Sequence, residues 1–465
     1  MSQIKEEKLY VYIALFFGII FVFLTPPFQS PDEDSHFKKA YQISRGNFYP
    51  TVKDNKKGNY FPKEMLIYID DKLSYIGDRD KKYLYSEMVM DQHSHMNYDD
   101  KKFNNYSTNS IIPIVYTAPA IGILFSKISA KIFGLEMIST AYMLYFARIF
   151  CLIFSIVVTY FAIKTTPVFK KTFAVVALIP MSLYLGSMVT YDNVLDSLIL
   201  LALSFILKIS YDKKIEKIPK SYIGILIIIG VILLNVKTVY FLVFLMMFSI
   251  PVKKFKDRKG MFKMAAIIIA FILGITLLLK LPLMLQKVVS ESSSLASKQL
   301  SFVLNNPFKY LKILLLNIYE QRYFQLSSMI CLFGLVDTYV PIPIIFMAYI
   351  YLVVIALMEG SIDKIKISRQ LKITGLIFIL LAVFGIYSAM YISWTPLITN
   401  KVGGDYISGV QGRYFLPLIM PVLLLFSNTK IKDNKFFKLV KDNYIIVPIM
   451  LLGSSIIMIL LRYWV

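Results

Sequence analysis

Long apolar runs recur from one end of the chain to the other, and they constrain its fold more than any other feature. The chain has 465 residues, of which 57% are hydrophobic. A helix of about 20 apolar residues crosses the hydrocarbon core of a bilayer, and many of the runs approach or exceed this length. Backbone polar groups in that core must be hydrogen-bonded within the protein, so the runs should be helical. The sequence therefore predicts an all-α polytopic membrane protein.

About eleven runs are candidates for transmembrane helices. They cover residues 9–25, 139–163, 172–188, 193–209, 221–236, 238–250, 262–281, 343–358, 373–394, 413–427 and 444–461. Two of these runs are short and meet at Lys237, which interrupts the apolar sequence. Such a break indicates a tight turn or a segment that lines a cavity.

The basic residues predict the orientation of these helices. The net charge is +22, and the basic residues gather in short segments between apolar runs. Six segments that fall on one side of the membrane carry 25 Lys and Arg against 9 Asp and Glu: 1–8, 164–172, 208–220, 253–263, 359–372 and 428–442. By the positive-inside rule this side is the cytoplasm, so the N-terminus is cytoplasmic and the first run is an uncleaved span. The charge pattern indicates a membrane protein and no nucleic-acid partner.

The large hydrophilic segment 26–110 should lie outside the cell. It carries 13 basic and 13 acidic residues and all three histidines. The apolar run 111–133 follows it, and counting this run as a span would reverse the side of every later loop. We therefore expect an interfacial or re-entrant helix there. Two cysteines, Cys151 and Cys331, lie in or near apolar runs, which argues against disulfides and cysteine metal sites.

Two regions of the chain are expected. Residues 1–281 would form a transmembrane module that includes the outer segment 26–138. Residues 282–465 would form a C-terminal transmembrane region with outer loops at 282–342 and 395–412.

Three consecutive acids follow the first run. Asp32, Glu33 and Asp34 lie just beyond three prolines that restrict the backbone, so these carboxylates should sit at the outer membrane surface. A carboxylate in that place could deprotonate a hydroxyl or hold a divalent cation. A solvated turn is the simpler alternative, and the local sequence leaves both open.

The three histidines give a weaker signal. His36 could orient an acid, bind a phosphate or ligate a metal together with His93 and His95. Asp34, His93 and His95 are weak candidates for a metal site, for which Mg²⁺ or Mn²⁺ are the possible ions. Surface histidines without a ligand are the more ordinary interpretation.

Cations are also expected at the outer ends of helices, against the positive-inside bias. They are Lys237, Arg322 and Arg413. Guanidinium and ammonium groups there could bind the phosphate of a lipid-linked substrate. The alternative is that they extend toward lipid headgroups, which suits Arg322 best. Gln411 and Tyr414 flank Arg413 in the stretch "GVQGRYFLP" and are expected to line the same site.

Further charges lie near or within spans. Arg148 should face protein or water and pair with an acid such as Asp192. Asp192 is expected to line the site, and Asp196, one helical turn further on, could have the structural role instead.

Several stretches resemble one known family. "PPFQSPDEDSHFKKAYQISRGNF", "PIVYTAPAIG", "YDNVLDSLILLAL", "VKTVYF" and "GVQGRYFLPL" follow the order of motifs in the bacterial membrane proteins described as domain of unknown function 2142. That family is in turn similar to the C-type (GT-C) glycosyltransferases, integral membrane enzymes that use polyprenyl-phosphate-linked sugars. These enzymes place an acidic catalytic residue in the first outer loop and follow it with interfacial helices.

The resemblance implies a function and roles for residues. The chain would be a bacterial plasma-membrane enzyme that transfers a sugar, with inversion, from a polyprenyl-phosphate donor to a surface glycan or glycolipid outside the cell. Asp32 would be the general base, Glu33 its neighbour in the site, and Arg413 and Lys237 the ligands of the donor phosphate. The alternatives are a polysaccharide polymerase or ligase, a flippase or transporter of lipid-linked glycans, and a scaffold of a cell-envelope assembly.

Overall fold

The computed structural model describes residues 4–93, 97–135, 138–286, 291–362, 364, 366–429 and 435–465, and in this part the chain is mostly helical. The first half contains α1 (Glu6–Leu24), α2 (Glu33–Ser44), β1 (Thr51–Lys53), β2 (Lys56–Pro62), α3 (Lys63–Leu73), α4 (Tyr85–His93), β3 (Lys101–Asn104), η1 (Pro113–Tyr116), α5 (Thr117–Ile132), α6 (Thr140–Thr165), α7 (Lys170–Ala177), α8 (Pro180–Gly186), α9 (Asp192–Tyr211) and α10 (Lys220–Val236). The second half contains η2 (Thr238–Ser249), η3 (Val252–Phe255), α11 (Arg258–Met284), α12 (Glu291–Asn305), α13 (Pro307–Glu320), α14 (Arg322–Ile330), β4 (Leu332–Phe333), β5 (Thr338–Tyr339), α15 (Ile342–Ile362), α16 (Arg369–Ala389), η4 (Met390–Trp394), α17 (Thr395–Thr399), η5 (Gly412–Leu418), α18 (Ile419–Phe426), α19 (Lys435–Asp442) and α20 (Ile446–Tyr463).

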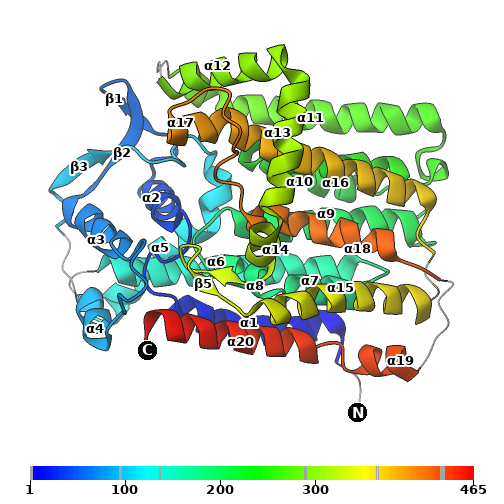
Figure 1. The fold of residues 1–465 in the computed structure, drawn as a ribbon, viewed down its shortest axis with the longest axis horizontal. Coiled ribbons are helices and arrows are strands. Elements are labelled where there is room, and N and C mark those ends of the chain that lie inside the picture. Colours follow the sequence, from blue (N-terminus) through cyan, green and yellow to red (C-terminus); the bar gives the residue numbers. More distant parts are fainter. Residues whose placement is uncertain are drawn as a thin grey trace.

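The long apolar helices run roughly parallel to the longest axis of the molecule, as Figure 1 shows for α1, α20, α15, α16 and α11. The small elements α2, α3 and α4 and strands β1 to β3 gather at one end of this bundle, which we call the sheet end. The three strands form an antiparallel sheet in the order β1-β2-β3. The C-terminus lies at the sheet end and the N-terminus toward the other end.

Eight helices in the described ranges are long and apolar enough to cross a membrane, and three shorter apolar helices accompany them. The shorter ones are Lys220–Val236, Thr238–Ser249 and Gly412–Phe426. The run 172–188, expected as one span, is divided into α7 and α8, because Pro180 disfavours helical backbone at the residue before it. Lys237 has extended backbone between α10 and η2, which confirms the expected break.

The helix α5 occupies the run whose place was hardest to predict. By length and composition Pro113–Ile132 qualifies as a span. A Cβ on Gly122 would collide with the backbone of Phe146 and Ala147, and Ser129 hydrogen-bonds to Tyr142. The ring of Phe125 also packs against Phe146 and Phe150, so α5 lies beside the first three turns of α6.

The end of α1 gives a reference point for the height of α5 and α6 along the bundle. Arg148 of α6 donates hydrogen bonds to the carbonyls of Val22, Thr25 and Pro26, where α1 ends. Tyr145 of α6 also stacks on Phe23 in the last turn of α1. The turn of α6 before Tyr145 therefore extends beyond the end of α1 by roughly 6 Å, at about 1.5 Å per residue. This position suits a helix at the membrane surface, and the interfacial location remains a prediction.

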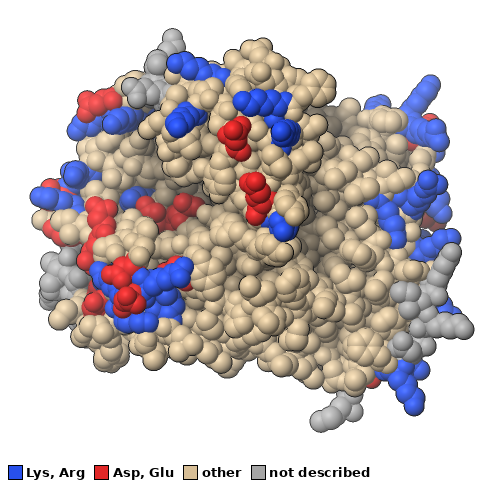
Figure 2. All heavy atoms as spheres, viewed as in Figure 1, with Lys and Arg blue, Asp and Glu red and all other residues tan. Residues whose placement is uncertain are grey.

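Lysine and arginine side chains gather at the end of the bundle opposite the sheet end, whereas acidic and basic side chains mix at the sheet end (Figure 2). The same view shows a hollow at the sheet end, with acidic side chains in it. This distribution matches the charge asymmetry of the loops in the sequence.

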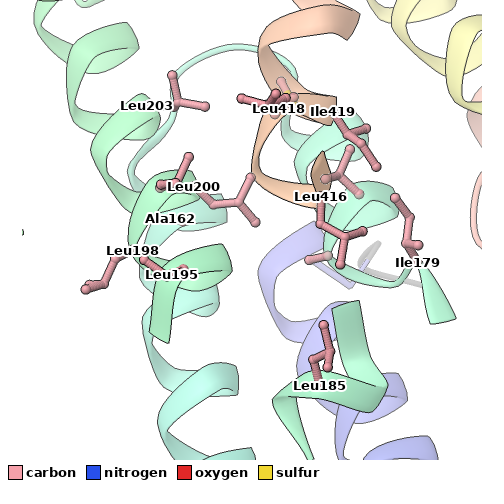
Figure 3. Close-up of a cluster of buried hydrophobic side chains, with 14 of the residues drawn as sticks. Ala162, Ile179, Leu185, Leu195, Leu198, Leu200, Leu203, Leu416, Leu418 and Ile419 are labelled. Carbon is pink, nitrogen blue, oxygen red and sulfur yellow. The ribbon is translucent and has the colours of Figure 1, made fainter. Parts of the chain in front are cut away.

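A buried apolar cluster joins α9 to η5 and α18. Figure 3 shows Leu195, Leu198, Leu200 and Leu203 of α9 near Leu416, Leu418 and Ile419 of the later segment, although more than 200 residues separate them in the chain. This packing fixes the first residue of α9 and the second residue of η5 relative to each other. Both residues carry charges.

Candidate functional site

Asp32 stands at the start of α2 with an unusual backbone conformation. Its φ is 61° and ψ 9°, in the left-handed region that aspartate tolerates better than most residues. Its carboxylate makes no capping hydrogen bond to α2, and its side chain is 59% exposed. Asp32 is therefore free to point away from its own helix toward another part of the protein.

The partner of Asp32 comes from the far end of the sequence. The Nη2 group of Arg413, in η5, donates a 2.8 Å hydrogen bond to Oδ2 of Asp32. The Arg413 side chain is only 5% exposed, so a buried cation holds an accessible carboxylate.

Two more charged groups, those of Asp192 and Lys237, lie on the buried side of Arg413. Nη1 of Arg413 lies 3.2 Å from Oδ2 of Asp192, and Nζ of Lys237 donates a 3.1 Å hydrogen bond to Oδ1 of the same carboxylate. Asp32, Arg413, Asp192 and Lys237 thus form a chain of alternating charge, which we call the charge relay. Its four members come from four segments, and the sequence analysis expected all four at the site.

Aromatic rings surround the cations. The Lys237 ammonium lies 3.8 Å from the ring centre of Tyr414 and 4.9 Å from that of Tyr191, and Arg413 also faces Tyr414. Rings in these positions stabilise cations while limiting their hydration. Sequence reasoning named Tyr414 but missed Tyr191, although Tyr191 directly precedes Asp192.

The electrostatics of the relay keep Asp32 ionised. Burial by the surrounding protein would raise the pKa of Asp32, but the positive charge of Arg413 and their hydrogen bond outweigh that effect and lower this pKa below its usual value. At neutral pH Asp32 is a carboxylate that can accept a hydrogen bond.

His36 lies one turn further along α2 and is buried. Its Nδ1 is 2.7 Å from the hydroxyl of Tyr116, and its ring packs edge-to-face on Tyr191 at 4.6 Å. Burial lowers its pKa to about 4, despite the nearby charge of Asp32, so the imidazole is neutral at neutral pH. His36 therefore braces the tyrosines of the site, and it is not the phosphate-binding cation considered from the sequence.

Glu33 faces away from Asp32. Its carboxylate accepts hydrogen bonds of 2.8 and 2.6 Å from Arg148 and one of 3.1 Å from the backbone N–H of Val189. Glu33 and Arg148 are both fully buried. The structure thus corrects the expected pairing of Arg148 with Asp192, and it gives Glu33 an internal ion pair instead of a place beside Asp32.

The remaining expected site residues lie elsewhere. Arg322 packs against the rings of Tyr319 and Tyr323 and hydrogen-bonds to the carbonyl of Tyr319, apart from the charge relay. Gln411 is the residue before η5, and Gly412 separates it from Arg413. A Cβ on Gly412 would collide with backbone atoms of α14, so this glycine permits the close approach that positions Arg413.

The weak metal candidates do not come together in the described residues. Asp34 pairs with Lys38 at 3.1 Å. The side chain of His93 and the whole of His95 lie outside the described part. In the part of the chain that the structure describes, no group of three or more His, Cys, Asp or Glu side chains could hold a metal ion.

An apolar groove of about 260 Å³ lies between α14, α15, α16 and the η5–α18 segment. Its walls are Gln325, Leu326, Met329, Tyr349, Leu352, Val353, Ile379, Val383, Phe415, Leu418, Ile419, Val422 and Leu423. Phe415, which follows Arg413 by two residues, is the groove residue nearest to the charge relay in the sequence.

A family model for predicted membrane proteins, domain of unknown function 2142 (DUF2142), matches residues 15–422. The chain belongs to this family. The match confirms the resemblance seen in the sequence motifs, and it contains all four residues of the charge relay. No curated protein and no solved structure matches the chain. What this member of DUF2142 does must therefore be inferred from its site.

Proposed function

We propose that the protein is a membrane glycosyltransferase. It transfers a sugar from a polyprenyl-phosphate-linked donor to a hydroxyl of a cell-surface glycan or glycolipid, with Asp32 as the general base. The observation that carries this proposal is the 2.8 Å contact between the exposed carboxylate of Asp32 and the buried guanidinium of Arg413, at the end of a bundle of membrane helices. A base and a phosphate-binding cation thus stand side by side.

The side of the membrane follows from the charges. Basic side chains gather at the end of the bundle opposite Asp32 (Figure 2). The positive-inside rule makes that end cytoplasmic, so Asp32 faces the outside of the bacterial plasma membrane. A polyprenyl carrier presents its phosphate and sugar at that surface.

Arg413 and Lys237 would bind the donor phosphate. The Nε of Arg413 is buried and has no hydrogen-bond partner among the described residues, and such a donor favours an incoming oxygen. Lys237 presents its other ammonium hydrogens beside the tyrosine rings. Both cations stay paired to Asp192, which orients them in the absence of substrate.

The arrival of the donor would activate the base. Arg413 holds the pKa of Asp32 low, which makes the carboxylate a weak base in the empty site. A phosphate that takes over part of the hydrogen bonding of Arg413 also offsets its charge, and the pKa of Asp32 then rises. The base therefore becomes stronger when the donor is in place, and a positioned general base contributes about 10² to 10⁴ in rate.

The charges balance in this reaction. The acceptor oxygen attacks the anomeric carbon as its proton passes to Asp32, and the bond between that carbon and the phosphate oxygen breaks with inversion. Asp32 changes from −1 to neutral, while the phosphodiester becomes a monoester and gains the same charge. Arg413 and Lys237 stabilise that new charge in a partly dry site, where fixed cations act more strongly than in water.

The apolar groove beside η5 gives the donor's isoprenoid chain a place. It is lined almost entirely by carbon, and α15 and α16 expose apolar side chains such as Ile350 and Leu380 next to it. A chain that enters from the bilayer would reach Phe415, two residues from the cation that binds its phosphate.

The test is a transfer assay with the purified full-length protein in nanodiscs. A panel of polyprenyl-phosphate sugars is supplied with glycan and glycolipid acceptors, and released polyprenyl phosphate and glycosylated product are measured by mass spectrometry. The proposal predicts turnover with at least one donor and a product of inverted anomeric configuration. Donor that crosses the bilayer of sealed proteoliposomes without bond cleavage would instead identify a flippase.

A further inference from the structure

A second cavity lies at the other end of α2 from Asp32. It has a volume of about 410 Å³, and its lining residues are Arg45, Tyr98, Lys127, Ala130, Lys131, Leu135 and Ile138. Arg45 follows the last residue of α2, so the 12 residues of this helix put roughly 18 Å between the cavity and the charge relay. The cavity is therefore separate from the proposed active site.

Three cations are among the residues that line this cavity. Within the described residues, Arg45, Lys127 and Lys131 form no ion pair with a carboxylate, and the recorded contact of Lys127 is with the ring of Tyr41, 5.9 Å from its centre. Lys127 and Lys131 are one helical turn apart on α5, a spacing at which like charges repel. An anion in the cavity would remove this repulsion.

The adjoining face of α5 is apolar and exposed. Its stripe consists of Ile121, Leu124, Phe125, Ile128 and Ile132, which recur at the spacing of one helix face. The half of α5 that carries Lys127 and Lys131 lies beside the turn of α6 that extends past the end of α1, because Ser129 hydrogen-bonds to Tyr142 there. The stripe and the cationic cavity therefore lie side by side at the level expected for lipid headgroups.

We propose that this cavity binds the phosphate of an anionic phospholipid whose acyl chains lie along the apolar stripe of α5. Phosphate oxygens accept charge-assisted hydrogen bonds from lysine and arginine, and basic pockets at a membrane surface commonly bind headgroups in this way. Tyr98, Leu135 and Ile138 would contact the glycerol part. This proposal does not depend on the transferase activity.

The apolar stripe is the reason to propose a phospholipid as the ligand. An acidic sugar chain would use the cations but would have no use for an adjoining row of isoleucine, leucine and phenylalanine. A phospholipid uses both features at once, because its headgroup and acyl chains are covalently joined.

The experiment measures lipid binding to the delipidated full-length protein by native mass spectrometry. The probes are phosphatidylglycerol, phosphatidylcholine and soluble glycerol phosphate. One molecule of phosphatidylglycerol should bind in preference to phosphatidylcholine. The double variant Lys127→Gln with Lys131→Gln should bind it about tenfold or more weakly, as expected from the loss of two charge-assisted hydrogen bonds.

The matched control removes the same charge elsewhere at the sheet end. Lys101 and Lys102 are exposed on β3 outside the cavity, and Lys101→Gln with Lys102→Gln should bind like the wild type. Arg45→Gln provides a second test of the cavity if the α5 variant is unstable. Equal weakening in the control pair, no preference for the anionic lipid, or glycerol phosphate binding as tightly as the lipid would each overturn the proposal.

Discussion

Glu33, the residue directly after the exposed Asp32, forms a fully buried ion pair with Arg148 through two hydrogen bonds. Arg148 also donates to three carbonyls at the end of α1, and Glu33 also accepts from the backbone of Val189. The pair thus ties together α1, α2, α6 and the segment before α9.

This relationship predicts a large loss of stability when one partner is removed. Glu33→Gln leaves Arg148 as an uncompensated buried charge, which should lower the free energy of unfolding by about 3 to 5 kcal/mol. Asp34→Asn is the matched control, because the pair of Asp34 with Lys38 is partly exposed and worth about 1 kcal/mol or less. Denaturant titration of both variants measures the difference, and equal stabilities would contradict a structural role for Glu33.

The buried His36 predicts an acid-sensitive stability. Its folded pKa of about 4 is below the usual histidine value of 6.5, so stability is fully present above pH 6.5 and is lost as the pH falls toward 4. Between pH 7 and pH 5 the loss should be about 2 kcal/mol. His36→Gln should reduce this pH dependence in thermal unfolding, since the other two histidines remain in both proteins. An unchanged pH profile would show that His36 titrates normally.

Lys237 is proposed to stabilise the charge on the donor phosphate. Lys237→Met removes a cation beside the proposed leaving group and should lower kcat by about 10² to 10³. Asp192 keeps its contact with Arg413 in this variant, which limits the structural damage. Lys38→Met, which removes a cation that pairs with Asp34 and not with a member of the charge relay, should leave kcat within a factor of a few. Steady-state kinetics with the best donor of the panel would measure both, and similar effects would argue against phosphate binding.

If the apolar groove binds the donor's lipid, blocking it should raise the KM only for donors with a long lipid chain. Val383→Trp fills the groove, so the KM for the full-length polyprenyl donor should rise about tenfold, the equivalent of roughly two buried CH₂ groups. The KM for a ten-carbon donor analogue should change little. Ile228→Trp, at an exposed position on α10 outside the groove, is the control and should affect neither donor. A uniform effect on both chain lengths would place the lipid elsewhere.

Much of the architecture follows from the sequence, because lipid imposes simple rules. Apolar length predicts helices, and the distribution of Lys and Arg predicts which loops share a side. Lys237 was recognisable as a break because it interrupts an apolar run. The division into α7 and α8 was missed, although Pro180 carried the signal.

The site was only partly predictable. Asp32, Asp192, Lys237 and Arg413 could be named because each is a charge at the end of an apolar run, where a charge needs a reason. Which charges pair could not be deduced, since the partners lie up to 381 residues apart and depend on helix packing. Glu33 shows the limit: it neighbours Asp32 in sequence, yet successive residues on a helix point about 100° apart, and Glu33 faces the interior.

The measurement that tests the central claim most directly compares Asp32→Asn with Asp34→Asn in the nanodisc transfer assay. The two substitutions make the same chemical change two residues apart, and both side chains are partly or largely exposed. We expect Asp32→Asn to stay folded but to transfer sugar about 10² to 10⁴ times more slowly, and Asp34→Asn to behave like the wild type. Wild-type turnover by a folded Asp32→Asn protein would contradict the assignment of Asp32 as the general base.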